Sequence, residues 1–128
     1  MHATRQVLAA SLIGVVVGGA AVQGLHAQAK PKAYLVTETE AIDAPAAVAV
    51  SQKTQGVIRA AGGRTIISNR GVITAVVGTA PGRFGVSEWE SVEKAQTYVN
   101  SPERKALAPE RDQAIKILRQ FIIEEFLN

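Results

Sequence analysis

The sequence contains no cysteine, and its only two histidines are His2 and His26. The missing thiols exclude a disulfide scaffold, a thiolate zinc site, a cysteine nucleophile and a lipid-modified cysteine. A domain formed by residues 30–128 also lacks histidine, so it cannot contain a Ser-His-Asp triad, a Cys-His pair or a histidine-ligated haem. We therefore expect a domain that works without a metal site and without a cofactor.

The N-terminal segment has the pattern of a secretory signal. Residues 7–22 form an apolar run without charge, which follows Arg5 and precedes small and polar residues. A basic start, an apolar middle and an A-x-A exit are typical of a cleaved signal peptide. We therefore predict that residues 1–29 are a signal peptide cut after Ala29, with Ala27 as the second choice. The protein is then exported, either to the periplasm or out of the cell.

An uncleaved membrane anchor is the alternative for this segment. Residues 7–25 are at the lower edge of the roughly 17 to 25 apolar residues that span a bilayer. Three glycines within the run weaken a helix, which favours cleavage. In the anchored case, residues 7–25 would hold the chain at the inner membrane, and the chain would contact a membrane only through them.

The charge of the remaining chain is small and evenly spread. The formal net charge is +3, and Arg5 is the only charged residue among the first 29, so a cleaved chain carries +2. A nucleic-acid binder gathers its basic residues into a patch. Here they are scattered from Lys30 to Arg119 among acids, so we expect no nucleic-acid partner. With 47% hydrophobic residues, residues 30–128 are suited to one domain.

Hydrophobic periodicity and capping residues predict alternating strands and helices. The expected strands are residues 33–40, 64–68, 72–77, 83–89 and 120–127, with 64–68 and 72–77 joined as a hairpin through 69–71 and 120–127 alternatively a helical end. The expected helices begin at Asp43, Ser91 and Ser101; the first ends at Gly62-Gly63, and the third divides at Pro109 and continues to Leu118. This order predicts a ferredoxin-like α+β fold, in which helices cover one face of an antiparallel sheet.

Several expected strands are apolar on both sides, as Ile66-Ile67, Val76-Val77 and Phe121-Ile122-Ile123 illustrate. The helices cover only one sheet face, and a domain this small can hardly expose the other. We therefore predict a homodimer whose sheets pack face to face, a dimeric α+β barrel. The alternative is that the C-terminal segment or a membrane covers that face.

Two pairs of carboxylates could act as acid and base. Glu38 and Glu40 are two residues apart on a predicted strand, and so are Glu88 and Glu90, so each pair could share one face. The alternative, which we favour, is a solvated strand face or end.

Arginines and aromatic residues provide the other candidates. Arg64 and Arg83 each open a predicted strand and could meet at one end of the sheet to hold an anion, although ion pairing with nearby acids is favoured. Trp89, the only tryptophan, could form the wall of a ligand site, but a core or dimer-interface role is favoured. Tyr34 and Tyr98 have the same two alternatives. The candidate residues for lining a cleft are therefore Tyr34, Arg64, Arg83, Glu88 and Trp89.

Short motifs follow one another along the chain. They are Tyr34, Asp43, Gly62-Gly63-Arg64, Arg83, Glu88-Trp89, Ser91-x-Glu93-x-Ala95 and Ser101-Pro102-Glu103. In this order and spacing, residues 32–128 resemble the DUF1330 family, a domain of unknown function. The resemblance implies a dimeric α+β barrel of ferredoxin-like subunits, and it implies no agreed activity or catalytic residues. The sequence lacks aromatic residues that the family pattern has early in the first helix and at Arg104.

Three functions are compatible with these residues. The first is binding of a small apolar or anionic molecule in a cleft of the dimer. The second is a cofactor-independent enzyme of the oxygenase or isomerase type, an analogy based on fold alone. The third is a structural or interaction dimer, which predicts no enclosed pocket.

Overall fold

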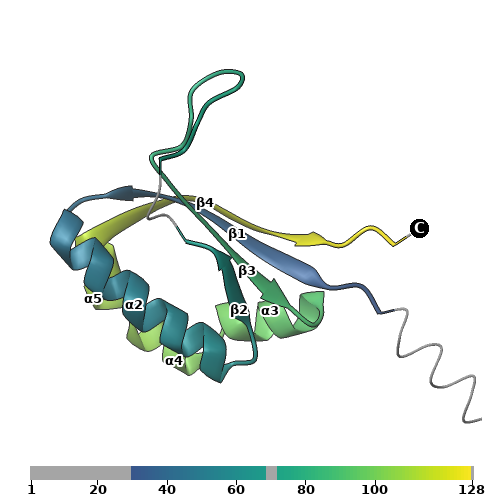
Figure 1. Ribbon diagram of the computed structural model, residues 1–128. Helices are drawn as coiled ribbons and strands as arrows, with labels where there is room; N and C mark the ends of the chain where they lie inside the picture. Colours follow the sequence, from purple (N-terminus) through teal and green to yellow (C-terminus); the bar gives the residue numbers. More distant parts are fainter. Residues whose placement is uncertain (1–29, 69–71, 128) are drawn as a thin grey trace, which may run out of the picture. The chain divides into compact units, whose positions relative to one another are not determined.

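A computed structural model describes residues 30–68 and 72–127 (Figure 1). The predicted signal peptide or anchor, and the turn of the predicted hairpin, lie outside the described residues. Within the described ranges, no helix is long and apolar enough to cross a membrane. Pro31–Phe126 pack together as one unit.

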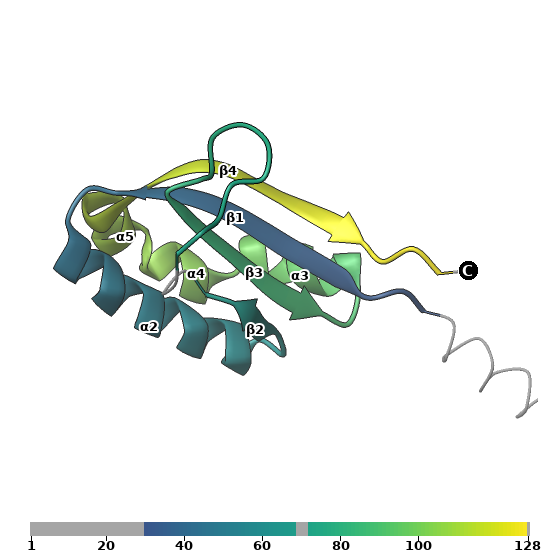
Figure 2. The same ribbon diagram turned by 45° about the horizontal axis from the view of Figure 1, so that its top comes forward.

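Four antiparallel strands form a sheet in the spatial order β2-β3-β1-β4. The strands are β1 (Ala33–Ala41), β2 (Arg64–Ile67), β3 (Arg83–Trp89) and β4 (Ile115–Glu124). The helices are α2 (Ala44–Ala60), α3 (Val92–Val99), α4 (Pro102–Ala106) and α5 (Ala108–Ala114). Figures 1 and 2 show these helices on one face of the sheet. The predicted ferredoxin-like α+β fold is confirmed.

Local chemistry sets both ends of α2. The Asp43 carboxylate accepts a hydrogen bond from the Ala46 backbone N–H at 3.1 Å, which satisfies a donor that the first turn leaves free. Beyond the last turn, Gly62 has a φ of 94°, a left-handed conformation that glycine adopts without a Cβ clash. Both ends lie where the sequence predicts them.

The same chemistry divides the second helical region. The Ser91 hydroxyl caps α3 by accepting a hydrogen bond from the Lys94 N–H at 3.2 Å, and the Ser101 hydroxyl caps α4 by accepting one from the Arg104 N–H, also at 3.2 Å. α4 and α5 are separate because Pro109, in the first turn of α5, has no N–H to continue the earlier helix. The predicted division at Pro109 is confirmed.

The predicted hairpin between residues 64–68 and 72–77 is wrong. Residues 72–82 form no strand, and β2 pairs with β3 instead. Val72, Val76 and Val77 are each more than 90% exposed. β-branched residues favour a strand where they pack on a half-buried pleated surface, and these side chains contact no such surface.

The predicted extension of the last helix to Leu118 is also wrong, because β4 already begins at Ile115. Ile115 and Ile117 face the helices, whereas Lys116 between them is exposed. This alternation has the period of a strand, not of a helix. The closing strand therefore begins five residues before its predicted start at Gln120 and ends at Glu124.

The core lies between the sheet and the helices. Trp89 is 1% exposed, and its ring stacks on Tyr98 with the centroids 4.8 Å apart. Ala33, Leu35 and Ile58 complete the packing around this pair. Trp89 therefore connects the end of β3 to α3 in the interior.

Candidate functional site

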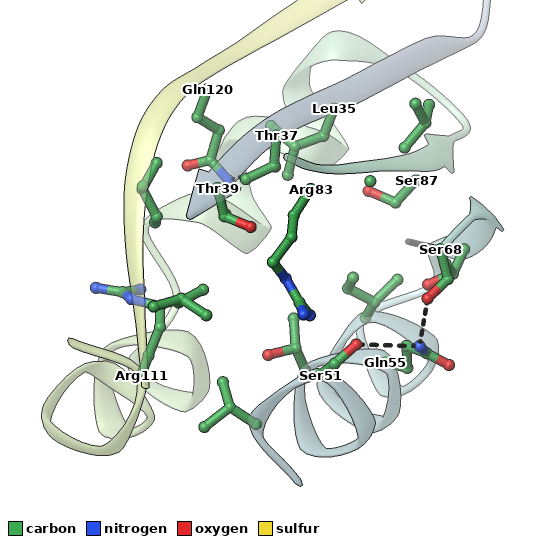
Figure 3. A pocket seen from close by; sticks show the side chains of 18 of the residues that line it. Leu35, Thr37, Thr39, Ser51, Gln55, Ser68, Arg83, Ser87, Arg111 and Gln120 are labelled. Atoms are coloured by element: carbon green, nitrogen blue, oxygen red, sulfur yellow. Dashed lines mark hydrogen bonds between the residues drawn. The ribbon is translucent and has the colours of Figure 1, made fainter. Parts of the chain in front are cut away.

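A cavity of about 150 Å³ lies between the sheet and the helices (Figure 3). Successive side chains of a strand point to opposite faces, so Leu35, Thr37 and Thr39 of β1 all face the helices. The two threonines are smaller than the leucine, and Gly85, paired with Thr37 on β3, has no side chain. Small residues in the middle of the sheet therefore leave space above α2. The apolar part of the wall includes Leu35, Val50, Ile58, Ile115 and Ile117.

The polar part of the cavity wall is positively charged. Arg83, Arg104 and Arg111 line the cavity, and no aspartate or glutamate does among the residues that the structure describes. The other polar groups are hydroxyls and amides, from Thr37, Thr39, Ser51, Thr54, Gln55, Thr65, Ser68, Ser87, Tyr98 and Gln120.

Arg83 is the arginine that extends into the cavity. Figure 3 shows its side chain reaching from β3 across the cavity toward Ser51 of α2. Its guanidinium makes no hydrogen bond or ion pair with any described part of the chain. The side-chain amide of nearby Gln55 does not contact Arg83 through a hydrogen bond. Its Nε2 donates to Ser68 Oγ at 3.2 Å and to Ser51 Oγ at 3.5 Å.

Arg104 is held by neutral partners. Its guanidinium donates to the Val99 carbonyl at 3.1 Å and to Gln120 Oε1 at 2.7 Å, and lies 5.9 Å from the centroid of the Tyr98 ring. Gln120 Nε2 in turn donates to Thr37 Oγ1 at 2.9 Å. This chain of contacts fixes Gln120 and Thr37 at the cavity wall. Arg111, in contrast, pairs with Asp112 at 3.1 Å.

Tyr98 connects the core to the cavity. It is 3% exposed, stacks on Trp89 and also lines the cavity. Burial raises the pKa of the Tyr98 hydroxyl above its ordinary value of 10.0, and the positive charges of Arg104 and Arg111 offset part of that rise. Tyr98 is therefore a neutral hydrogen-bonding group at neutral pH.

Thr65 of β2 contributes a polar atom with an unmet hydrogen bond. Its Oγ1 is buried and has no hydrogen-bond partner among the described residues. Every other buried side-chain nitrogen or oxygen in the described ranges has a hydrogen-bond partner. A buried hydroxyl without a partner costs free energy, about 1–3 kcal/mol. Thr65 lines the cavity, so a hydrogen-bonding group that enters beside it could lower this cost.

The structure places the five candidate residues on two sides of the sheet. Arg83 lies in the cavity and Trp89 in the core, on the helix side. Tyr34, Arg64 and Glu88 lie on the opposite side, where Tyr34 and Arg64 are each paired in register with Glu88. Arg64 NH2 is 3.3 Å from Glu88 Oε2. These three residues are brought together, and Arg83 and Trp89 are separated from them by the sheet.

The prediction that Arg64 and Arg83 meet at one end of the sheet is wrong. Each residue opens its strand, but β2 and β3 run antiparallel, and Arg64 pairs with Glu88 near the far end of β3. The favoured alternative, ion pairing, is confirmed for Arg64. Glu38, for which a solvated strand face was the favoured alternative, also forms an ion pair, since its Oε2 accepts from Arg119 Nε at 2.7 Å.

The sequence predicts none of Thr37, Arg104 and Gln120 as site residues. For Tyr98 it leaves a ligand wall and a core position open, and the structure places Tyr98 both in the core and at the cavity wall. One signal was present: Thr37 and Thr39 occupy the same side of β1 as Leu35, where a filled core would need larger apolar residues. In the described ranges, no group of three or more acidic residues is placed to hold a metal ion.

A sequence profile of the domain of unknown function DUF1330 matches residues 32–126. The chain belongs to the DUF1330 family. The predicted resemblance to DUF1330 is therefore confirmed over these residues. A search of functionally curated proteins found no match.

Solved structures with the same fold extend this comparison. A protein of unknown function from Rhodopseudomonas palustris is 12% identical, with a TM-score of 0.59 over 81% of this chain and 92% of that chain. SnoaB from Streptomyces nogalater, a cofactor-independent oxygenase, is 10% identical, with a TM-score of 0.57 over 77% of this chain and 96% of its own. At these identities the likeness establishes the fold of this DUF1330 member alone.

Proposed function

We propose that the domain binds a small organic molecule in the cavity between its sheet and α2. The observation that carries this proposal is the cavity, of about 150 Å³, in which apolar residues lie beside hydroxyls and arginines. Small-molecule sites combine an apolar wall with a few convergent polar groups, and a structural dimer needs no such space. The sequence predicts a ligand in a cleft of the dimer, whereas this cavity is lined by the residues of one subunit.

Thermal-shift measurements on the full-length chain test the proposal with a panel of small aromatic, lactone and quinone-like compounds. We expect at least one class to raise the unfolding temperature, because a ligand of the folded state stabilises it by mass action. Ser51→Leu fills the cavity from α2 and should remove this shift. Gln52→Leu places the same side chain at an exposed position of α2 and should retain it. No shift with any compound, or an unchanged shift in Ser51→Leu, would contradict the proposal.

A cofactor-independent oxygenase is the second candidate. SnoaB, which shares the fold, is described as one. The feature of this chain that favours such an activity is Tyr98, a buried phenol that lines the cavity beside Arg104. With a compound that binds, an oxygen electrode should record uptake by the wild-type protein and slower uptake by Tyr98→Phe. Equal uptake by both proteins would remove Tyr98 from the reaction.

We also propose that two copies associate through the sheet face opposite the helices, here called the open face. Phe121 and Ile123 of β4 are 44% and 50% exposed on this face. The ion pairs Glu38–Arg119 and Arg64–Glu88 lie on it too, so the face carries charges of both signs around apolar residues. A two-fold axis brings the same patch of both copies together, so a charge on one copy can meet a charge of opposite sign on the other. Light scattering should give twice the mass of one chain.

The N-terminal pattern supports a further proposal, that residues 1–29 act as an export signal. Mass spectrometry of the exported protein should find Lys30 as the first residue. A chain that still begins at Met1 would favour the membrane anchor of residues 7–25.

A further inference from the structure

The charge of the cavity wall restricts the chemistry of the ligand. Of the three arginines that line the cavity, Arg111 pairs with Asp112, and Arg104 is held by the Val99 carbonyl and Gln120. Only Arg83 has a guanidinium without any acceptor among the residues that the structure describes, and no acidic residue lines the cavity. The wall therefore has an excess of positive charge where Arg83 projects.

A partly buried guanidinium without an acceptor is unfavourable, because it has lost water and gained no partner. An exposed arginine avoids this cost by pointing its head group into solvent. Arg83 instead extends between β3 and α2, beside the hydroxyl of Ser51 (Figure 3). The group that would complement it is an anion, and a carboxylate fits its planar fork of donors with two parallel hydrogen bonds.

The cavity volume limits the rest of the ligand. A cavity of about 150 Å³ accepts a ring of about the size of benzene. Leu35, Val50 and Ile58 supply apolar surface for such a body. An inorganic anion would leave this surface uncovered.

From these observations we infer that the ligand is a small organic carboxylate, with its carboxylate on Arg83 and its apolar body against Leu35, Val50 and Ile58. This inference rests on the proposed function, because it assumes that the cavity is the binding site. Arg83 is then the residue that selects acids over neutral molecules of the same shape.

Calorimetric titration of the full-length chain with benzoate, benzamide and inorganic phosphate tests the inference. Benzamide has nearly the shape of benzoate without its charge, and phosphate has charge without an apolar body. We expect benzoate to bind about tenfold more tightly than benzamide, because a charge-assisted pair is the stronger hydrogen bond, and to bind more tightly than phosphate. This comparison uses only the wild-type protein, so it does not depend on the folding of any variant.

Variants then test whether Arg83 is the residue that recognises the carboxylate. Arg83→Gln should bind benzoate no better than benzamide, and Arg83→Lys should restore part of the preference. Arg59→Gln removes an equal charge from an exposed position in the last turn of α2 and should leave the preference unchanged.

The results separate a failure of the carboxylate inference from a failure of the proposed function. If benzamide binds as tightly as benzoate in the wild type, or if Arg83→Gln keeps the preference, the carboxylate inference is overturned while binding in the cavity stands. Tighter binding of phosphate than of benzoate also overturns it. If no probe binds and no compound of the panel shifts the unfolding temperature, the proposed function fails together with the inference.

Discussion

Gly63 lies so close to the indole of Trp89 that no larger residue fits there. A Cβ added at Gly63 would be 2.6 Å from Cζ2 of the Trp89 ring, which is itself 1% exposed and stacked on Tyr98. The ring is held by this stacking and by the hydrogen bond from Trp89 Nε1 to Ser87 Oγ at 2.9 Å. It therefore has little freedom to move away.

Gly63→Ala should lower the free energy of unfolding by about 1–3 kcal/mol, the usual cost of overpacking a core. Gly56→Ala is the matched control, since a Cβ at Gly56 meets nothing within 4 Å and the residue lies inside α2. It should raise stability by about 0.5–1 kcal/mol through helix propensity. Urea unfolding of both variants measures these changes, and equal effects would refute the steric account.

Glu88 gives the fold a dependence on pH. Partial burial acts to raise the pKa of its carboxyl, but the charges and hydrogen bonds of Lys32 and Arg64 together outweigh it, so the pKa lies below the ordinary 4.5. As pH falls, the unfolded chain takes up this proton first. The stabilisation is therefore present above about pH 4.5 and is lost as the pH falls through the lower pKa of the folded state.

The wild-type protein should accordingly be more stable than Glu88→Gln at pH 7, and the difference should shrink as the pH falls from 5 to 3. Denaturant unfolding across this range measures it. Glu90→Gln is the control, because Glu90 is exposed and has no ion pair within the described ranges. A difference between wild type and Glu88→Gln that does not depend on pH would contradict the linkage.

At the level of single residues, the sequence predicts Arg83 as a residue of the site, but it does not predict which residues surround it. Its place at the start of a strand follows from local pattern, whereas its distance from Arg64 depends on the direction in which β2 and β3 pair. Tyr98 and Arg104 reach the cavity only because α3 packs against the sheet and α4 packs against α2. Such contacts depend on tertiary packing, which the periodicity of one segment does not contain.

Residues 72–82, which precede β3, include the most exposed large hydrophobic side chains of the described ranges. Figures 1 and 2 show the chain before β3 projecting away from the helices, on the side of the open face. Its valines Val76 and Val77 are both 93% exposed. Surface side chains without contacts contribute little to the stability of a subunit.

Replacing both Val76 and Val77 with serine should therefore change the free energy of unfolding of a subunit by less than about 0.5 kcal/mol. Val50→Ala, at a position that is 2% exposed in α2, should cost about 2 kcal/mol. Unfolding at a protein concentration low enough to exclude association tests both. A large loss in the double variant would mean that the valines pack within the subunit.

The elements that the sequence predicts well are those set by neighbouring residues. Asp43, Ser91 and Ser101 each cap a helix through a hydrogen bond that spans three residues, and Pro109 divides α4 from α5 without help from the rest of the fold. Residues 72–77 form no strand because β-branched residues favour a strand only where their side chains find a surface to pack on. Their partner would have to come from elsewhere in the sheet.

For the whole molecule, the open face decides whether the proposed dimer forms. Phe121, on the edge strand β4, pairs in register with Val36 of the inner strand β1. A carboxylate in this position would be buried without a partner if two open faces packed together.

Phe121→Asp should therefore shift the molar mass in light scattering from that of two chains to that of one. Val48→Asp is the control on the helix side, where a residue of similar exposure, 51%, lies on α2. It should leave the mass unchanged. A dimer that survives Phe121→Asp would exclude the open face as its interface.

The two ends of the domain are joined by hydrogen bonds. The Glu125 N–H donates to the Lys32 carbonyl at 2.8 Å, and the Lys32 N–H donates to Glu125 Oε2 at 3.2 Å. A short Gly-Ser linker could therefore connect Phe126 to Pro31, and new termini could be opened between Gly78 and Thr79. The circularly permuted chain should keep the circular dichroism spectrum of the original. The order of the strands along the chain would then have changed while their order in the sheet stayed the same.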